Sequence, residues 1–174
     1  RRTLEEFTSV GIRHLSASTA FLTYPEAQFD MVRLGHLAYG LEEGFEPILE
    51  LKSKVVFIKD VRQGARISYN STFTCARPSK IATIPVGYGD GYHRCLSNKA
   101  QVEILGKLCP IIGNITMDMM MVDITDLGDI PIGTDVILIG ANITADSLAK
   151  LANTIDYELL TNIALRVPRI TIEE

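Results

Sequence analysis

The chain has 174 residues, 47% of them hydrophobic, and a formal net charge of -4. This composition is typical of a folded core, alone or with part of a neighbouring domain, and argues against a disordered chain. The Lys and Arg residues are scattered, so the sequence predicts no nucleic-acid partner, and no apolar run approaches the roughly 18 to 20 residues that cross a bilayer. Cys75, Cys95 and Cys109 have no CxxC spacing, which favours buried, reduced thiols over disulfides or a metal site and predicts a cytoplasmic setting.

The first forty residues alternate between helix and strand, as α/β units do. RRTLEEFTSV reads as the end of a helix, IRHLSAS as a short strand, TAFLTYPEAQF as a helical turn broken by Pro25, and DMVRLGHLAYG as a second strand covered on both faces. Arg33 in that apolar run either reaches solvent at the strand end or meets an acceptor in a site. The first residue is Arg and the rest of a sheet is missing, so we expect a fragment.

From about Pro47 the chain becomes rich in β-strand patterns separated by Gly, Pro, Asn and Asp. Their spacing predicts a barrel or a sandwich, with a domain boundary near residue 43. ITADSLAKLANTI predicts a helix capped by Thr144, YELLTNIA a second helix, and RVPRITIEE a terminal strand.

Several residues combine a structural and a functional interpretation. Neighbouring parallel strands can place His14 beside Arg33, and can place Ser18 and Gly35 at the edge of a sheet where barrels bind phosphate. The structural alternative for Ser18 is a helix cap. Tyr69 is expected on a strand, where aromatic side chains usually pack.

Two further motifs carry candidate residues. No helical pattern follows PVGYGDGYHR, so this Gly-x-Gly-x-Gly run predicts a tight turn that presents Tyr88 rather than a dinucleotide-binding loop. The methionines of NITMDMMMVDIT, Met117 to Met121, predict core filling, and Asp118 among them needs a partner if it is buried.

Taken in order, the motifs RHLSAS, DMVRLGHLAYG, GARISYNSTF, IPVGYGDGYHRCLSN, PIIGNITMDMMMVDITD and TIDYELLTNIALRVPR resemble the C-terminal part of the alanine racemases, which depend on pyridoxal 5'-phosphate. The resemblance covers nearly the whole chain. It implies a mainly β fold in which residues 1–43 are the last strands of a (β/α)8 barrel and residues 44–174 are the barrel-like C-terminal β domain. The Met-rich segment is also similar to the racemase domains of membrane-bound serine and alanine racemases associated with vancomycin resistance.

The resemblance also implies a role for each candidate residue. Arg33 faces the pyridine nitrogen of the cofactor, where a guanidinium donates a hydrogen bond without protonating the ring and so favours racemisation over transamination. Tyr69 is one of two acid/base groups, acts across a homodimer interface, and is paired with a lysine on the opposite face of the α-carbon. The other implied positions are His14, which supports Arg33; Ser18, Gly35, His36 and Tyr157 around the cofactor phosphate; Tyr88 at the inner gate of the substrate corridor; and Met117 and Asp118 at the substrate carboxylate.

The chain departs from the family pattern at two positions, and it lacks the motif of the family's cofactor-binding lysine. Ala17 stands where asparagine is usual, and His36 where an aliphatic residue is common. No lysine of the sequence lies in the motif of the family's cofactor-binding lysine, so we expect this chain alone to be inactive. Three interpretations follow: part of an alanine racemase that supplies D-alanine for peptidoglycan, part of a serine racemase, or a non-catalytic β module. The large Tyr157 favours alanine.

Overall fold

The computed structural model describes residues 11–42 and 44–172, and the chain divides into two compact units, Arg1–Ile48 and Leu49–Glu174. The helix expected in the first ten residues lies outside the described part. Each unit has its own sheet, and each is described by itself below.

In the first unit, β1 (His14–Ala17) pairs in parallel with β2 (Met31–Arg33), and α2 (Ser18–Thr23) connects them. Pro25 begins a 3₁₀ turn, Pro25–Ala27, because its ring cannot continue the preceding helix. A further 3₁₀ turn, Leu37–Tyr39, follows β2. The predicted strand–helix–strand order is therefore confirmed. The second strand is shorter than predicted and is not covered on both faces, since Met31 and Arg33 are exposed.

An ion pair fixes the start of the parallel pair. The Arg13 Nε and Nη2 atoms donate to the two carboxylate oxygens of Asp30 at 2.7 and 2.9 Å, and the Arg13 backbone amide donates to the same carboxylate at 3.0 Å. These bonds lower the pKa of Asp30 to about 2. The contact joins the residue before β1 to the residue before β2.

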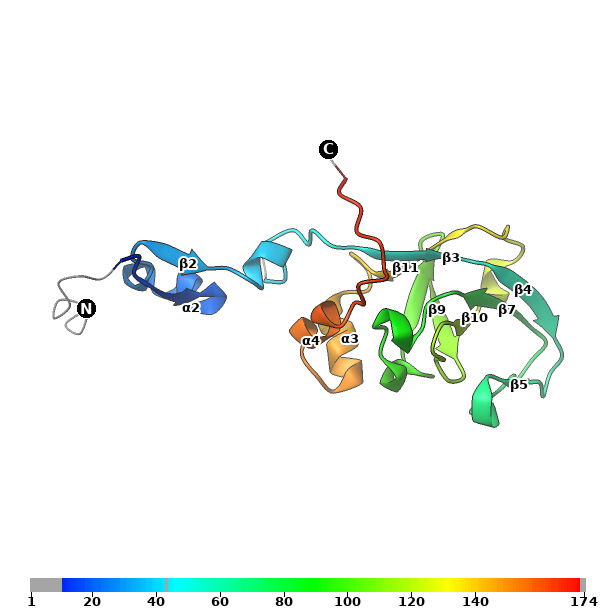
Figure 1. Ribbon diagram of the computed structural model, residues 1–174. Helices are drawn as coiled ribbons and strands as arrows, with labels where there is room; N and C mark the ends of the chain where they lie inside the picture. Colours follow the sequence, from blue (N-terminus) through cyan, green and yellow to red (C-terminus); the bar gives the residue numbers. More distant parts are fainter. Residues whose placement is uncertain (1–10, 43, 173–174) are drawn as a thin grey trace. The chain divides into compact units, whose positions relative to one another are not determined.

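The second unit is built on one antiparallel sheet of seven strands, in the order β3-β11-β8-β9-β10-β7-β4, which curls into a half-barrel (Figure 1). Its strands are β3 (Leu51–Lys54), β4 (Phe57–Val61), β7 (Ser79–Ile84), β8 (Gln101–Ile104), β9 (Lys107–Ile112), β10 (Met120–Asp123) and β11 (Asp135–Ile139). This confirms the predicted mainly β, barrel-like class.

The predicted run ILELKSKVVFIKDV forms the two opposite edges of this sheet rather than one strand. Val55 and Val56 link β3 to β4, and their amides donate to Thr134 and Thr83, which lie on opposite sides of the curl. The short link therefore joins the end of one edge strand to the start of the other. Along β8, Val102 and Ile104 are buried while Gln101 is exposed, which is the period of two expected for a strand with one face on the core.

Two helices cover one end of the sheet. In α3 (Ala145–Ala152), the Thr144 hydroxyl accepts the amide of Ser147 at 3.1 Å, which confirms the predicted cap. The second predicted helix is α4 (Asp156–Thr161). The predicted terminal strand is wrong for the described residues, because residues 166–172 have no regular structure and pair with no sheet edge there.

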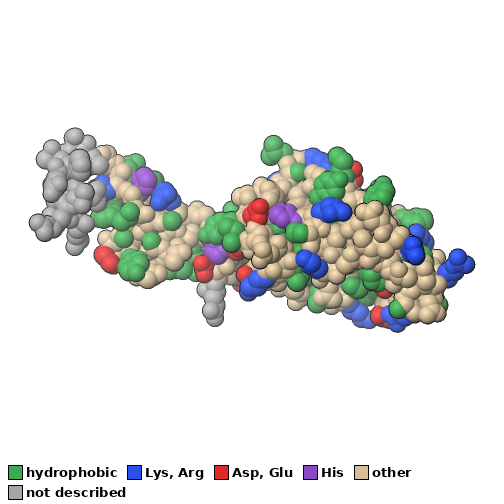
Figure 2. Space-filling view, turned by 90° about the horizontal axis from the view of Figure 1, so that it is seen from below, with side chains coloured by type: hydrophobic (Ala, Val, Ile, Leu, Met, Phe, Trp, Pro, Cys, Tyr) green, Lys and Arg blue, Asp and Glu red, His purple; other side chains and the backbone are tan. Residues whose placement is uncertain are grey.

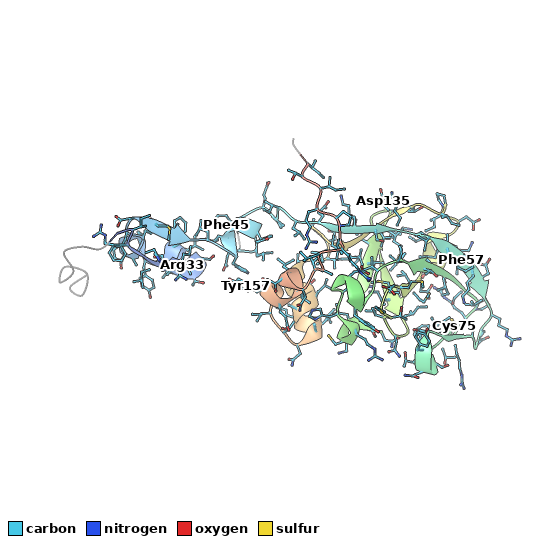
Figure 3. All side chains as sticks on the ribbon, viewed as in Figure 1. Arg33, Phe45, Phe57, Cys75, Asp135 and Tyr157 are labelled. Atoms are coloured by element: carbon cyan, nitrogen blue, oxygen red, sulfur yellow. The ribbon has the colours of Figure 1, made fainter. Side chains whose placement is uncertain are left out.

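A small hairpin carries Tyr69. It consists of β5 (Arg66–Ile67) and β6 (Phe73–Thr74), joined through a 3₁₀ turn, Tyr69–Ser71. The strand predicted for Tyr69 is therefore wrong, because Ser68, Asn70 and Ser71 all have positive φ. A cluster of apolar side chains attaches the hairpin to the large sheet, near Cys75 in Figure 3; its buried members are Ile67, Cys75, Ile81 and Ile112.

Two of the three cysteines are buried, as the sequence predicts. Cys75 and Cys109 are buried, but Cys95 is exposed, so the prediction of three buried thiols is wrong for Cys95.

Charged side chains of both signs are scattered over the face of the second unit seen in Figure 2. Within the described residues, no helix is long and apolar enough to cross a membrane, and no group of His, Cys, Asp and Glu side chains is arranged to hold a metal ion.

Candidate functional site

Ser18 lies in the first unit directly after β1, and its hydroxyl oxygen accepts hydrogen bonds from two backbone amides. Its Oγ lies 3.3 Å from the amide of Gly35 and 3.4 Å from the amide of Leu37, both of which follow β2. The structure therefore brings Ser18 and Gly35 to the same edge of the parallel pair. The residue that caps α2 is Ala17, so the helix-cap interpretation of Ser18 is wrong.

This edge has the chemistry of an anion site. Backbone amides and a hydroxyl that lie close together can donate hydrogen bonds to the oxygens of a phosphate group. Space is available as well, because a Cβ added at Gly35 would meet nothing within 4 Å.

Arg33, at the end of β2, is exposed in the first unit (Figure 3) and donates from Nη2 to the carbonyl of Leu15 at 3.3 Å. The register pairs Arg33 with Ala17 and pairs His14 with Met31, so His14 is not the direct cross-strand neighbour of Arg33. His36 is partly buried, and its Nδ1 lies 3.2 Å from a carboxylate oxygen of Glu42.

Four of the candidate residues of the second unit, Tyr69, Tyr88, Met117 and Asp118, lie on or beside the loop between β9 and β10, residues 113–119, which we call the central loop. The tight turn of Tyr88 packs against it: the Tyr88 amide donates to the Thr116 carbonyl at 3.0 Å, and the Gly89 amide to the Met117 carbonyl at 2.8 Å. A Cβ at Gly87 would lie 2.1 Å from the Thr116 oxygen, so only glycine permits this approach. The predicted turn is confirmed, and the Tyr88 side chain is 49% exposed.

Arg166 joins this turn to the central loop through charge. Its Nε donates to Asp90 at 2.8 Å and its Nη2 to Asp118 at 2.7 Å, so one guanidinium bridges two carboxylates. The two carboxylates raise the pKa of Arg166. Asp118 thus has a partner, although it is exposed rather than buried.

The methionines divide at the start of β10. Met120 is fully buried, as core filling predicts, but Met117 and Met119 are 53% and 45% exposed. The prediction is wrong for the latter two because they belong to the loop before the strand begins.

Tyr69 meets the same central loop from the hairpin. The Ser68 hydroxyl donates to the Asn114 carbonyl at 2.6 Å, and the Asn114 side-chain amide donates to the Tyr69 carbonyl at 2.9 Å. The Tyr69 side chain is 74% exposed. Tyr92, by contrast, is buried, and burial raises its pKa, so it keeps its proton. Tyr69 and Tyr88 are therefore the tyrosines at this loop whose side chains are exposed.

Sequence reasoning missed Asn114 and Arg166. Asn114 lies four residues before Asp118 in the same motif, but nothing in the motif shows that its side chain reaches the hairpin. Arg166 is too distant along the chain for any spacing rule. Tyr157, which was predicted, is half-exposed on α4 of the second unit (Figure 3), whereas Ser18, Gly35 and His36 belong to the first.

Comparison with known proteins identifies the family. The model of the family described as "Alanine racemase, C-terminal domain" matches residues 48–171, and that of "Alanine racemase, N-terminal domain" matches residues 1–43. The chain belongs to the alanine racemase family. The predicted resemblance is thereby confirmed.

Individual relatives agree with this assignment. The alanine racemase of Clostridium novyi is 44% identical over 97% of this chain and 47% of its own length. A solved alanine racemase from Bacillus anthracis with bound L-Ala-P has 38% identity and a TM-score of 0.89 over 98% of this chain and 47% of its own. One from Bartonella henselae with covalently bound pyridoxal phosphate has 32% identity and a TM-score of 0.88 over 98% of this chain and 49% of its own. The chain spans about half the length of the curated relatives it matches.

Proposed function

We propose that this chain forms the C-terminal part of a pyridoxal-phosphate-dependent racemase that interconverts L- and D-alanine. The observation that carries the proposal is the exposed Tyr69, held on a turn against the central loop that also carries Met117 and contacts the turn of Tyr88. Family membership supports alanine as the substrate, and D-alanine for peptidoglycan as the product's use. In this proposal residues 1–43 are the last strands of the barrel and residues 44–174 are the β domain.

The residues of the first unit fit the cofactor. Ser18 and the amides of Gly35 and His36 would hold its phosphate, with Tyr157 of the second unit as a further partner. The donation of the Gly35 amide to the Ser18 hydroxyl supports the role of these two residues. The Arg33 guanidinium, supported by His14, would donate to the pyridine nitrogen. When bound, the cofactor supplies an electron sink for the substrate α-carbon.

The residues of the second unit handle the substrate. The Tyr69 phenolate would take a proton from one face of the α-carbon, and in the opposite direction the Tyr69 hydroxyl would give a proton to that face. The backbone at Met117, with Asp118 beside it, binds the carboxylate, and Tyr88 narrows the corridor. In the family arrangement Tyr69 serves the barrel of a second copy, so we propose a homodimer. The proton on the opposite face requires a lysine that these 174 residues do not supply in its motif, so we propose that the chain alone is inactive.

A fusion protein tests the proposal. The N-terminal half of the Clostridium novyi relative is joined to this chain, loaded with pyridoxal phosphate, and assayed with L-alanine and with L-serine. We expect racemisation by the fusion and none by the chain alone. Tyr69→Phe should lower kcat by at least about a hundredfold, the typical contribution of one acid/base group. Tyr24→Phe, at another exposed tyrosine, is the matched control and should retain the rate.

The other interpretations predict different results. A higher rate with L-serine than with L-alanine would identify a serine racemase. A folded fusion that holds the cofactor but racemises neither amino acid, or one in which Tyr69→Phe has no effect, would overturn the proposal and favour a non-catalytic module.

A further inference from the structure

We propose that Asn98 and Asn114 are positioning residues for Tyr69: their side-chain amides hold the turn that carries it against the central loop. This inference rests on the proposed function, because it concerns the acid/base role given to Tyr69. It is carried by the backbone conformation of the turn and by four side-chain hydrogen bonds.

The turn of Tyr69 has a backbone that its residues do not favour. Ser68 has φ 63° and ψ -179°, and Asn70 and Ser71 have φ 61° and 51°. Positive φ is unfavourable for residues that carry a Cβ, and three such residues surround Tyr69. A conformation of this kind persists only when surrounding contacts hold it in place.

Asn114 holds the first half of the turn through two hydrogen bonds, one that it accepts and one that it donates. Its carbonyl accepts the Ser68 hydroxyl at 2.6 Å, and its side-chain amide donates to the Tyr69 carbonyl at 2.9 Å. The approach is close because Gly113 has no side chain: a Cβ there would lie 2.6 Å from the Ser68 Cβ. Asn114 therefore binds the backbone of Tyr69 itself.

Asn98 holds the second half and the base of the loop together. Its Oδ1 accepts the Gly113 amide at 2.6 Å, and its Nδ2 donates to the Thr72 hydroxyl at 3.2 Å. One side chain thus spans from the central loop to the end of the turn. Next to it, the Ser97 hydroxyl accepts the Ile115 amide at 2.9 Å, which fixes the loop on its other side.

These contacts fix the backbone on both sides of Tyr69 while its ring stays exposed. Proton transfer requires heavy atoms within hydrogen-bond reach, and small displacements of a catalytic group reduce the rate steeply. Loosening the turn should therefore lower kcat and leave KM nearly unchanged, since neither asparagine is placed at the substrate.

The first experiment uses the full chain without cofactor. Asn114→Asp keeps the size of the side chain but removes the N–H donor that binds the Tyr69 carbonyl. Asn98→Gly removes both Asn98 contacts and suits the positive φ of residue 98. Asn142→Asp is the control because the Asn142 amide donates to Glu103 away from the turn. Hydrogen exchange is followed at the Ser71 amide, which donates to the Ser68 carbonyl within the turn. We expect exchange about five- to tenfold faster in Asn114→Asp, the effect of losing one ordinary hydrogen bond, at least as large an increase in Asn98→Gly, and unchanged exchange in the control.

Thr72→Val is a milder second variant. It removes the hydroxyl that Asn98 binds, at an exposed position, and so tests the same contact where the asparagine variants fail to fold. Unchanged exchange at Ser71 in Asn114→Asp, or in both Asn98→Gly and Thr72→Val, would overturn the proposal.

The second experiment measures the fusion protein. We expect Asn114→Asp to lower kcat about tenfold with KM unchanged, and to cause no further loss when Tyr69 is already Phe, because residues that act through one group are not additive. A full additional loss in the Tyr69→Phe background would overturn the positioning role. An inactive fusion would count against the proposed function alone, since the exchange measurement still decides whether the two asparagines hold Tyr69.

Discussion

Ile115 is the point at which the hydrophobic core supports the central loop, and Ile115→Ala is the perturbation that tests this support. The side chain is 1% exposed, while the neighbouring Asn114 and Thr116 contact the turns of Tyr69 and Tyr88. Replacing it removes buried apolar atoms directly beneath the loop and leaves the loop's polar contacts chemically intact.

The magnitude follows from the atoms removed. Ile→Ala deletes three carbons, which at about 0.8 kcal/mol each amounts to roughly 2.4 kcal/mol of lost transfer free energy. A cavity contribution brings the expected loss of unfolding free energy to about 3 kcal/mol, within the usual range for such substitutions. For a unit of about 125 residues, the entropy of unfolding converts this loss into a fall in Tm of roughly 10 °C.

Urea and thermal unfolding followed by circular dichroism measure this loss, because the chain contains no Trp for fluorescence. Ile132→Ala is the matched control, since Ile132 is 65% exposed, and should change stability by less than about 0.5 kcal/mol. A loss in Ile115→Ala no larger than in Ile132→Ala would show that the core does not anchor the loop through Ile115.

Three further predictions concern charge and thiol chemistry. Arg166→Met should speed hydrogen exchange at the Gly89 amide, since the bridge from Asp90 to the central loop is lost, and 1 M NaCl should partly reproduce this in the unsubstituted chain; equal exchange rates would contradict it. The Asp30 carboxyl should titrate near pH 2 when followed by NMR, so its contribution to stability is full above about pH 4 and is lost as the pH falls towards 2. Arg13→Met should return the midpoint of this titration to about 3.9. An unchanged midpoint in that variant would be inconsistent with the ion pair. Iodoacetamide at neutral pH should label Cys95 alone in the folded chain, and mass spectrometry finding two or three labels would contradict the burial of the other cysteines.

Local patterns were sufficient for the class of the fold and for several elements. The alternation of buried and exposed residues in β8 depends only on the period of a strand, and the cap at Thr144 depends only on the next three residues. The Gly-x-Gly turn of Tyr88 was also predictable, because glycines mark close backbone approach wherever the approaching chain comes from.

The tertiary structure decided what these elements do together. Tyr69 was expected on a strand because aromatic residues usually occur there, but contacts from Asn98 and Asn114 hold it in a turn that its own backbone disfavours. Arg166 reaches Asp90 and Asp118 across 76 and 48 positions of the chain. Local sequence patterns were sufficient for α3, α4, most strands of the large sheet and the kinds of chemical groups available, but not for the turn of Tyr69 or for residues 166–172. Only the folded chain decided which groups meet, because hydrogen bonds and ion pairs depend on distance in space, which separation along the sequence does not reveal.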